Sequence, residues 1–119
     1  MINPFKDQEK FMQACDQSVT GDQAQFDMYI NLIAEEFQEL QDADNDVDTL
    51  DALIDILVVT IGTIHSMGAD GEGAWIEVMR SNFAKIDHDT GKVRKREDGK
   101  VLKPEGWTPP ELEQFLRKV

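Results

Sequence analysis

Carboxylates spaced three and four residues apart dominate the first half of this 119-residue chain. Residues at these spacings share one face of a helix, so their side chains can converge. Two such helices packed antiparallel would surround a pocket with acidic oxygens, the ligands that Mg²⁺ and Mn²⁺ prefer. We therefore predict a Mg²⁺ site, with Mn²⁺ as a second candidate ion, and metal-assisted phosphate chemistry. The predicted metal ligands are Glu35, Glu36, Glu39, Asp51 and Asp55.

The two aspartates stand in a segment, residues 50–61, that is otherwise apolar apart from one threonine. Such a helix is expected to be buried, and a buried carboxylate must be neutralised or paired. The chain has no lysine or arginine between Lys10 and Arg80, so a metal or a basic group brought in by the fold must supply the charge. The alternative interpretation places Asp51 and Asp55 at a solvated edge of the helix.

Composition limits the classes of partner. Twelve basic against twenty-four acidic residues give a net charge of −12, which disfavours binding to nucleic acid or to an anionic membrane. A free nucleotide bridged by a metal ion remains compatible with this charge. The single Cys15 cannot form an intramolecular disulfide, and neither a targeting signal nor a membrane span is visible. We predict one cytoplasmic domain over residues 1–119.

Helical periodicity predicts the elements that must position the carboxylates. Over residues 5–86, Asp22 is expected to cap a second helix, Gly68 to end a third, and Asp70 to cap a fourth that ends near Ile86. We expect an all-α bundle of four to five helices as the body of the domain.

The last third of the chain, residues 87–119, has a different character. Seven of the twelve basic residues lie between positions 85 and 103, where turn dipeptides flank a short alternating stretch. This pattern predicts a small hairpin or an ordered arm, and Thr108 with Glu111, spaced as a capping box, predicts a final short helix. The arm is interpreted either as a lid for a triphosphate or as a clasp on the acidic body of its own or a neighbouring subunit.

Taken in order, these motifs resemble those of the all-α nucleoside triphosphate pyrophosphohydrolases. That superfamily includes MazG-like proteins, phosphoribosyl-ATP pyrophosphohydrolases and all-α dUTPases, and the resemblance points in particular to the phage-type, single-domain MazG-like branch. It extends over about residues 5–110. The residues that carry it are Glu35-Glu36-Phe37-Gln38-Glu39, Asp51-Ala52-Leu53-Ile54-Asp55, Gly62, Gly68, Trp75, Asn82, Lys85 and Gly99-Lys100-Val101-Leu102-Lys103-Pro104.

The resemblance implies an enzyme that hydrolyses a (deoxy)nucleoside triphosphate between its α and β phosphates, giving a monophosphate and pyrophosphate. Glu36 and Glu39 would be catalytic, with Glu36 as the base. The superfamily pattern is EExxE followed by ExxD, so Asp48 is an alternative here to Asp51 as the first acid of the second motif. The resemblance also implies a homodimer or homotetramer in which neighbouring subunits complete each pocket.

Six residues are implied to contact the substrate. By their positions in the superfamily pattern, Asn82 and Lys85 would hold phosphate or sugar. Lys100 and Lys103 would close over the polyphosphate. Tyr29 and Trp75 would line a pocket for the base, although residues at such helical spacing also fit a packed core.

A second hypothesis is a non-catalytic acidic helical protein that binds a basic partner. Net charge alone fits this class of protein. It does not explain two aspartates in an apolar helix or a separate basic arm. A titration with divalent metal followed by thermal melting separates the two hypotheses, because a metal site in the folded state raises its stability.

Overall fold

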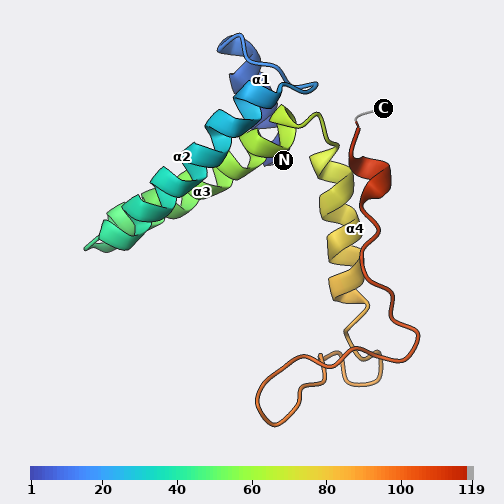
Figure 1. The fold of residues 1–119 in the computed structure, drawn as a ribbon. Coiled ribbons are helices and arrows are strands. Elements are labelled where there is room, and N and C mark those ends of the chain that lie inside the picture. Colours follow the sequence, from blue (N-terminus) through green and yellow to red (C-terminus); the bar gives the residue numbers. More distant parts are fainter. Residues whose placement is uncertain (118–119) are drawn as a thin grey trace. The chain divides into compact units, whose positions relative to one another are not determined.

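The computed structural model describes residues 1–117, so the last two residues of the predicted C-terminal helical segment lie outside the described residues. Within the described part, the chain contains four α-helices and one 3₁₀ turn and no β-strand, which confirms the predicted all-α class (Figure 1). The chain divides into two compact units, residues 1–71 with 115–117 and residues 72–114. The fourth helix therefore groups with the arm rather than with the first three helices.

The first unit is built from α1 (Pro4–Ala14), α2 (Gln23–Asp42) and α3 (Asp46–Ser66). Each helix begins after an Asn or Asp whose side chain accepts a hydrogen bond from a backbone N–H in the first turn. The predicted cap is confirmed at Asp22, whose Oδ1 accepts from the N–H of Gln25 at 2.9 Å.

Helices α2 and α3 lie side by side and antiparallel (Figure 1). Residues 43–45 join them at one end, and at the other end the N–H of Asp22 donates to the carbonyl of Ser66 at 2.9 Å. Towards this second end, a Cβ added at Gly62 would collide with the ring of Tyr29. Glycine at this position therefore allows the close approach of the two helices that places their acidic segments opposite each other.

The core of this unit is small. Met12, Tyr29 and Val59 are buried, with Leu32 and Ile33 packed against them. The hydroxyl of Tyr29 is satisfied within the core, because it donates to Oε1 of Gln17 at 2.6 Å. Three helices of these lengths cannot enclose every apolar side chain that they carry.

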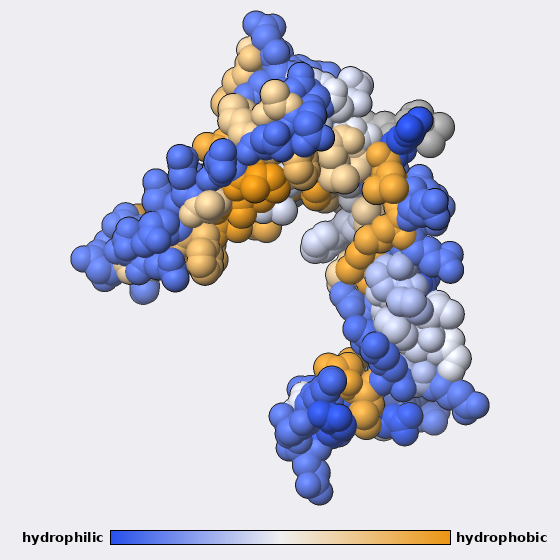
Figure 2. All heavy atoms as spheres, in the orientation of Figure 1, coloured by the Kyte–Doolittle hydropathy of each residue, from blue (hydrophilic) through white to orange (hydrophobic). Residues whose placement is uncertain are grey.

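The expectation that the apolar helix is buried is met only in part. Leu50, Leu53, Ile54 and Leu57 are between 44% and 62% exposed on α3. Figure 2 shows apolar side chains gathered along the α2–α3 pair. The reason is that only α1 and α2 pack on α3 within this unit. One side of α3 thus remains open, and we call these four residues the exposed α3 face.

The second unit contains α4 (Gly71–Phe83), which ends three residues before the predicted position, followed by the arm. The arm has no strand among the described residues, but isolated antiparallel bridges join Ile86 to Val93 and Lys95 to Val101. The alternative of an ordered arm is thus the one observed.

The predicted final helix is wrong in extent, because the segment as described up to residue 117 forms only the 3₁₀ turn Glu113–Phe115. The capping box expected of Thr108 and Glu111 does not close. Instead, the N–H of Glu111 donates to the carboxylate of Glu77 at 2.7 Å, which holds this segment extended along α4. The Nη2 of Arg80 supports the same arrangement by donating to the carbonyl of Thr108 at 3.4 Å.

No helix among residues 1–117 combines the length and the apolar character that a membrane span requires.

Candidate metal centre

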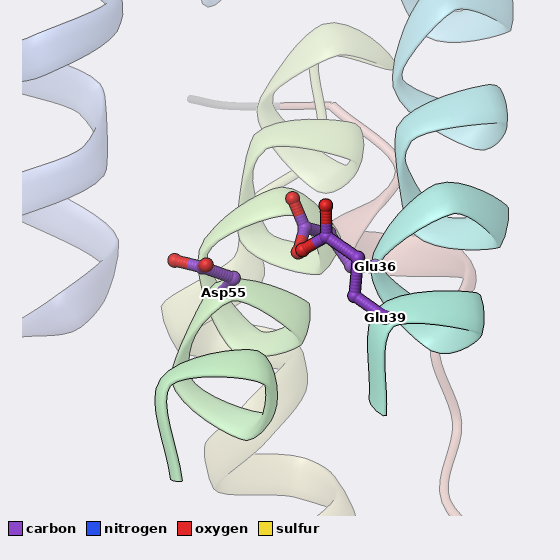
Figure 3. A group of neighbouring side chains, drawn as sticks. All are labelled: Glu36, Glu39 and Asp55. Atoms are coloured by element: carbon purple, nitrogen blue, oxygen red, sulfur yellow. The ribbon is translucent and has the colours of Figure 1, made fainter. Parts of the chain in front are cut away.

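Three of the five predicted ligands converge. Glu36 and Glu39 lie one turn apart on α2, and Asp55 lies near them on the neighbouring helix α3 (Figure 3). One carboxylate oxygen from each residue lies within 4.8 Å of the others. The i, i+3 spacing on α2 and the antiparallel pairing with α3 together produce this geometry, as the sequence predicts.

The electrostatics of the cluster are unfavourable without a cation. Burial raises the pKa of Glu36, a side-chain hydrogen bond with Glu39 raises it further, and the charges of Glu39, Asp55 and Asp51 add to the effect. Burial also raises the pKa of Asp55, with Asp51 and Glu39 adding to the effect. Each acid is thus held partly away from water beside groups of its own charge, which disfavours the ionised form.

One oxygen of the cluster has no hydrogen-bond partner. Oε2 of Glu36 is buried and has no hydrogen-bond partner. A buried acceptor without a partner is costly, and a carboxylate oxygen more so than a neutral one. No lysine or arginine forms an ion pair with the cluster among residues 1–117. Three carboxylates with an unsatisfied oxygen therefore fit a hard divalent cation such as Mg²⁺ or Mn²⁺.

The two other predicted ligands lie outside this group of three. Glu35 and Asp51 are exposed, although the charge of Asp51 acts on both Glu36 and Asp55. Their roles as ligands stay predictions.

The alternative acid, Asp48, is also not one of the converging three. Its carboxylate accepts a hydrogen bond from Nδ2 of Asn45 at 2.8 Å, at the first turn of α3. Asp48 therefore takes part in starting the helix.

Comparison with protein families gives the affiliation of the chain. The sequence profile of the phosphoribosyl-ATP pyrophosphohydrolase family (PRA-PH) matches residues 8–82, more than half of the chain and the whole of the acidic cluster. The chain belongs to this family. The family is part of the MazG-like NTP pyrophosphohydrolase superfamily, so the resemblance is confirmed. Membership supports a pyrophosphohydrolase enzyme. A comparison with curated protein sequences gave no match.

The family match ends at Asn82, the first of the residues expected to contact phosphate or sugar. Nζ of Lys85 donates to Oδ1 of Asn82 at 3.2 Å, so these two predicted residues are direct neighbours. Nζ of Lys103 lies 4.6 Å from the ring centre of Trp107. The side chain of Lys100 is exposed on the arm.

Tyr29 and Trp75 have different surroundings. Tyr29 is 4% exposed and packs in the core of the first unit, which matches the alternative interpretation of this residue. Trp75 is 60% exposed on α4. Their expected place in a base pocket stays a prediction for both.

Sequence reasoning missed Trp107. Its Nε1 donates to the carbonyl of Ser81 at 2.7 Å, and the ammonium groups of Lys85 and Lys103 lie over its ring. The signal available was an aromatic residue just after a lysine-rich segment, a combination that favours cation–π contacts. Trp107 anchors the end of the arm to α4 and holds Lys85 in place.

Proposed function

We propose that this chain hydrolyses a (deoxy)nucleoside triphosphate between the α and β phosphates, producing a nucleoside monophosphate and pyrophosphate. The observation that carries the proposal is the convergence of Glu36, Glu39 and Asp55, one of which, Glu36, has a buried carboxylate oxygen without a hydrogen-bond partner. Membership of a pyrophosphohydrolase family supports the reaction type.

Glu36, Glu39 and Asp55 would hold Mg²⁺ or Mn²⁺, with Glu35 and Asp51 as further proposed ligands. When bound, such an ion neutralises phosphate oxygens and lowers the pKa of a coordinated water. Two observations favour the three converging acids as its ligands. They supply only oxygen atoms, and their mutual repulsion is relieved by a positive charge.

Glu36 is the proposed general base. In hydrolysis, the oxygen of water forms a bond to phosphorus, the bridging P–O bond breaks, and pyrophosphate leaves with the electron pair of that bond. The proton of the water passes to a carboxylate. Burial and neighbouring acids raise the pKa of Glu36, which makes it a better proton acceptor than an ordinary glutamate. Glu39 is proposed as the second catalytic acid, beside it on α2.

Asn82 and Lys85 are proposed to bind phosphate or sugar, as direct neighbours on and just after α4. The amide and the ammonium group both donate hydrogen bonds, which suits an anionic substrate. Lys100 and Lys103 stay proposed contacts of the polyphosphate, and Tyr29 and Trp75 stay proposed contacts of the base.

The protein is also proposed to act in the cytoplasm as a homodimer or homotetramer, without a nucleic-acid or membrane partner. The exposed α3 face supports self-association, since apolar side chains left open by α1 and α2 gain from burial against a second copy.

A panel of substrates tests the proposal. Ribonucleoside and deoxyribonucleoside triphosphates, together with phosphoribosyl-ATP, are incubated with Mg²⁺ or Mn²⁺, and the phosphorus products are separated by ³¹P NMR. We expect monophosphate and pyrophosphate in equal amounts from at least one substrate. Diphosphate and phosphate would indicate cleavage at another bond. No turnover of any substrate with either ion would favour the non-catalytic acidic protein instead.

A further inference from the structure

The second unit contains a cavity of about 640 Å³ with a distinctive lining. Its volume falls in the range of about 300–1,000 Å³ that is typical of pockets for small ligands. The cavity is lined by Asn82, Lys85, Lys92, Val93, Lys95 and Val101. Three lysines and one amide thus face a common space with no carboxylate among them, in a protein whose net charge is −12.

The charges of these three lysines are not neutralised within the described chain. The arginines nearby behave differently, because Arg94 lies 3.9 Å from Asp87 and Arg96 lies 2.7 Å from Asp98. No lysine forms an ion pair among residues 1–117. The arm therefore contains paired arginines and unpaired lysines, and two of the unpaired ones, Lys92 and Lys95, line the cavity.

Two of the four polar groups are held in place by α4 and the end of the arm. Nζ of Lys85 donates to Oδ1 of Asn82 at 3.2 Å and lies 5.3 Å from the centre of the Trp107 ring. This contact occupies the acceptor end of the Asn82 amide. Its Nδ2 has only a long contact of 3.7 Å to Sδ of Met79, so this donor remains available to a stronger acceptor.

The other two lysines are placed by the backbone of the arm. The carbonyl of Lys92 accepts from the N–H of Asp87 at 2.8 Å, next to the bridge between Ile86 and Val93. Lys95 pairs with Val101 through the second bridge. Fixed backbone positions lower the cost of bringing several like charges to one cavity, because they need not be assembled at the moment of binding.

A neighbouring cavity of about 470 Å³ has the opposite character. It shares Lys85 but is also lined by the acids Asp87, Asp89 and Glu105. It also contains Arg94, which is paired with Asp87. Its mixed charge gives no preference for an anion. Lys103 lines neither cavity and lies over Trp107, and Lys100 is also absent from both linings.

We propose that Lys85, Lys92, Lys95 and Asn82 form a binding site for a pyrophosphate-type anion, either free pyrophosphate or the polyphosphate of a nucleotide. Three ammonium groups and an amide donor match an anion that carries several charges and many acceptor oxygens. The choice of this anion rests on the proposed function. Lys92 and Lys95 are the new binding residues. Lys100 and Lys103 do not line this cavity and are not part of the proposed site.

The test is calorimetric titration of the full chain with inorganic pyrophosphate, in buffer stripped of divalent ions so that the acidic cluster contributes no affinity. We expect the Lys92→Met/Lys95→Met double variant to bind at least about tenfold more weakly, a loss of about 1.4 kcal/mol. The Lys92→Arg/Lys95→Arg variant keeps the charge and should bind nearly as the parent does. The matched control is Lys6→Met/Lys10→Met on α1, with the same change in net charge and no change in affinity.

The outcomes separate this proposal from the proposed function. Equal pyrophosphate affinity in the parent and the Lys92→Met/Lys95→Met variant, or no binding by the parent, overturns the site. A short oligonucleotide that binds the parent through these lysines, when pyrophosphate does not, also overturns it. Lysine-dependent pyrophosphate binding in a protein that hydrolyses no nucleotide would support the site and reject the enzyme. Nucleotide hydrolysis without lysine-dependent pyrophosphate binding would support the enzyme and reject the site.

Discussion

The two compact units handle charge in opposite ways. Residues 1–71 contain fifteen acidic and two basic residues, whereas residues 72–114 contain nine acidic and eight basic residues. In the first unit, the converging acids have no cationic partner among the described residues. In the second unit, Arg80, Arg94 and Arg96 each pair with a nearby acid. The acids of the first unit thus lie together without a cation from the described chain, whereas the second unit pairs its arginines with acids and leaves its lysines without ion pairs.

The pKa values of two glutamates, one in each unit, show this difference. Burial and neighbouring acids raise the pKa of Glu36, whereas hydrogen bonds from Arg80 and from the backbone N–H of Glu111 lower the pKa of Glu77 to about 2. The same side chain titrates in opposite directions because one glutamate faces like charges and the other faces donors. Glu77 is thus satisfied within the fold, whereas Glu36, a proposed metal ligand, keeps one buried oxygen without a partner.

Replacing Glu39 with Gln should have the largest effect on the difference between the two units, because it removes a charge from the converging acids. The change removes one charged oxygen donor from the converging acids, so nucleotide turnover with Mg²⁺ should fall by about a hundredfold or more. In divalent-free buffer the melting temperature should stay the same or rise, because repulsion with Glu36 decreases. Pyrophosphate release and thermal melting measure the two effects. The control is Glu9→Gln on α1, which should keep parental activity. A folded Glu39→Gln protein with near-parental turnover would refute the assignment.

A second expected effect concerns the exposed α3 face. If this face packs against a second copy, Leu57→Asp places a charge in an apolar interface and should convert the oligomer to a smaller species. Sedimentation velocity measures the change, and Ile2→Asp, at an exposed position before α1, is the control. Identical sedimentation of the Leu57→Asp variant and the parent would show that this face is not the contact.

The pH dependence of stability should differ between the two glutamates. The folded-state pKa of Glu36 is raised, so the unfolded chain ionises first as the pH rises above the ordinary value of 4.5. The free energy of unfolding of the metal-free protein should therefore fall as the pH rises from 4.5 through the folded-state pKa. Glu77 has the opposite sign, because its contribution is present above pH 4.5 and is lost as the pH falls towards about 2.

Denaturant unfolding of the metal-free protein at several pH values, compared with Glu36→Gln and Glu77→Gln, tests these signs. The Glu36→Gln variant should lose part of the decline above pH 4.5, and Glu77→Gln should lose part of the decline below it. Parental slopes in both variants would mean that neither shift contributes to stability.

The sequence predicts the elements that depend on local chemistry. The cap at Asp22, the end of α3 before Gly68 and the convergence of Glu36 with Glu39 all follow from spacing over a few residues. The facing position of Asp55 also follows, because a link of residues 43–45 forces α2 and α3 to run antiparallel.

Features that depend on contacts distant in sequence could not be predicted in this way. The final helix does not form because the backbone N–H of Glu111 donates to the carboxylate of Glu77, thirty-four residues earlier. Lys103 lies over Trp107, and the cavity collects Lys92 and Lys95 instead. Counting basic residues in the arm shows that cations are present, but only the fold shows which of them are paired. The open side of α3 has the same origin, since burial depends on which helices pack against it.

The central claim is that Glu36, Glu39 and Asp55 form a cation site, and the titration of Glu36 tests it most directly. Carbon-detected NMR of the side-chain carboxyl, assigned with the Glu36→Gln variant, follows its pKa without and with Mg²⁺. We predict a pKa above the ordinary value of 4.5 in divalent-free buffer, and the loss of that shift when Mg²⁺ is added. An ordinary pKa that does not respond to Mg²⁺ would contradict the claim.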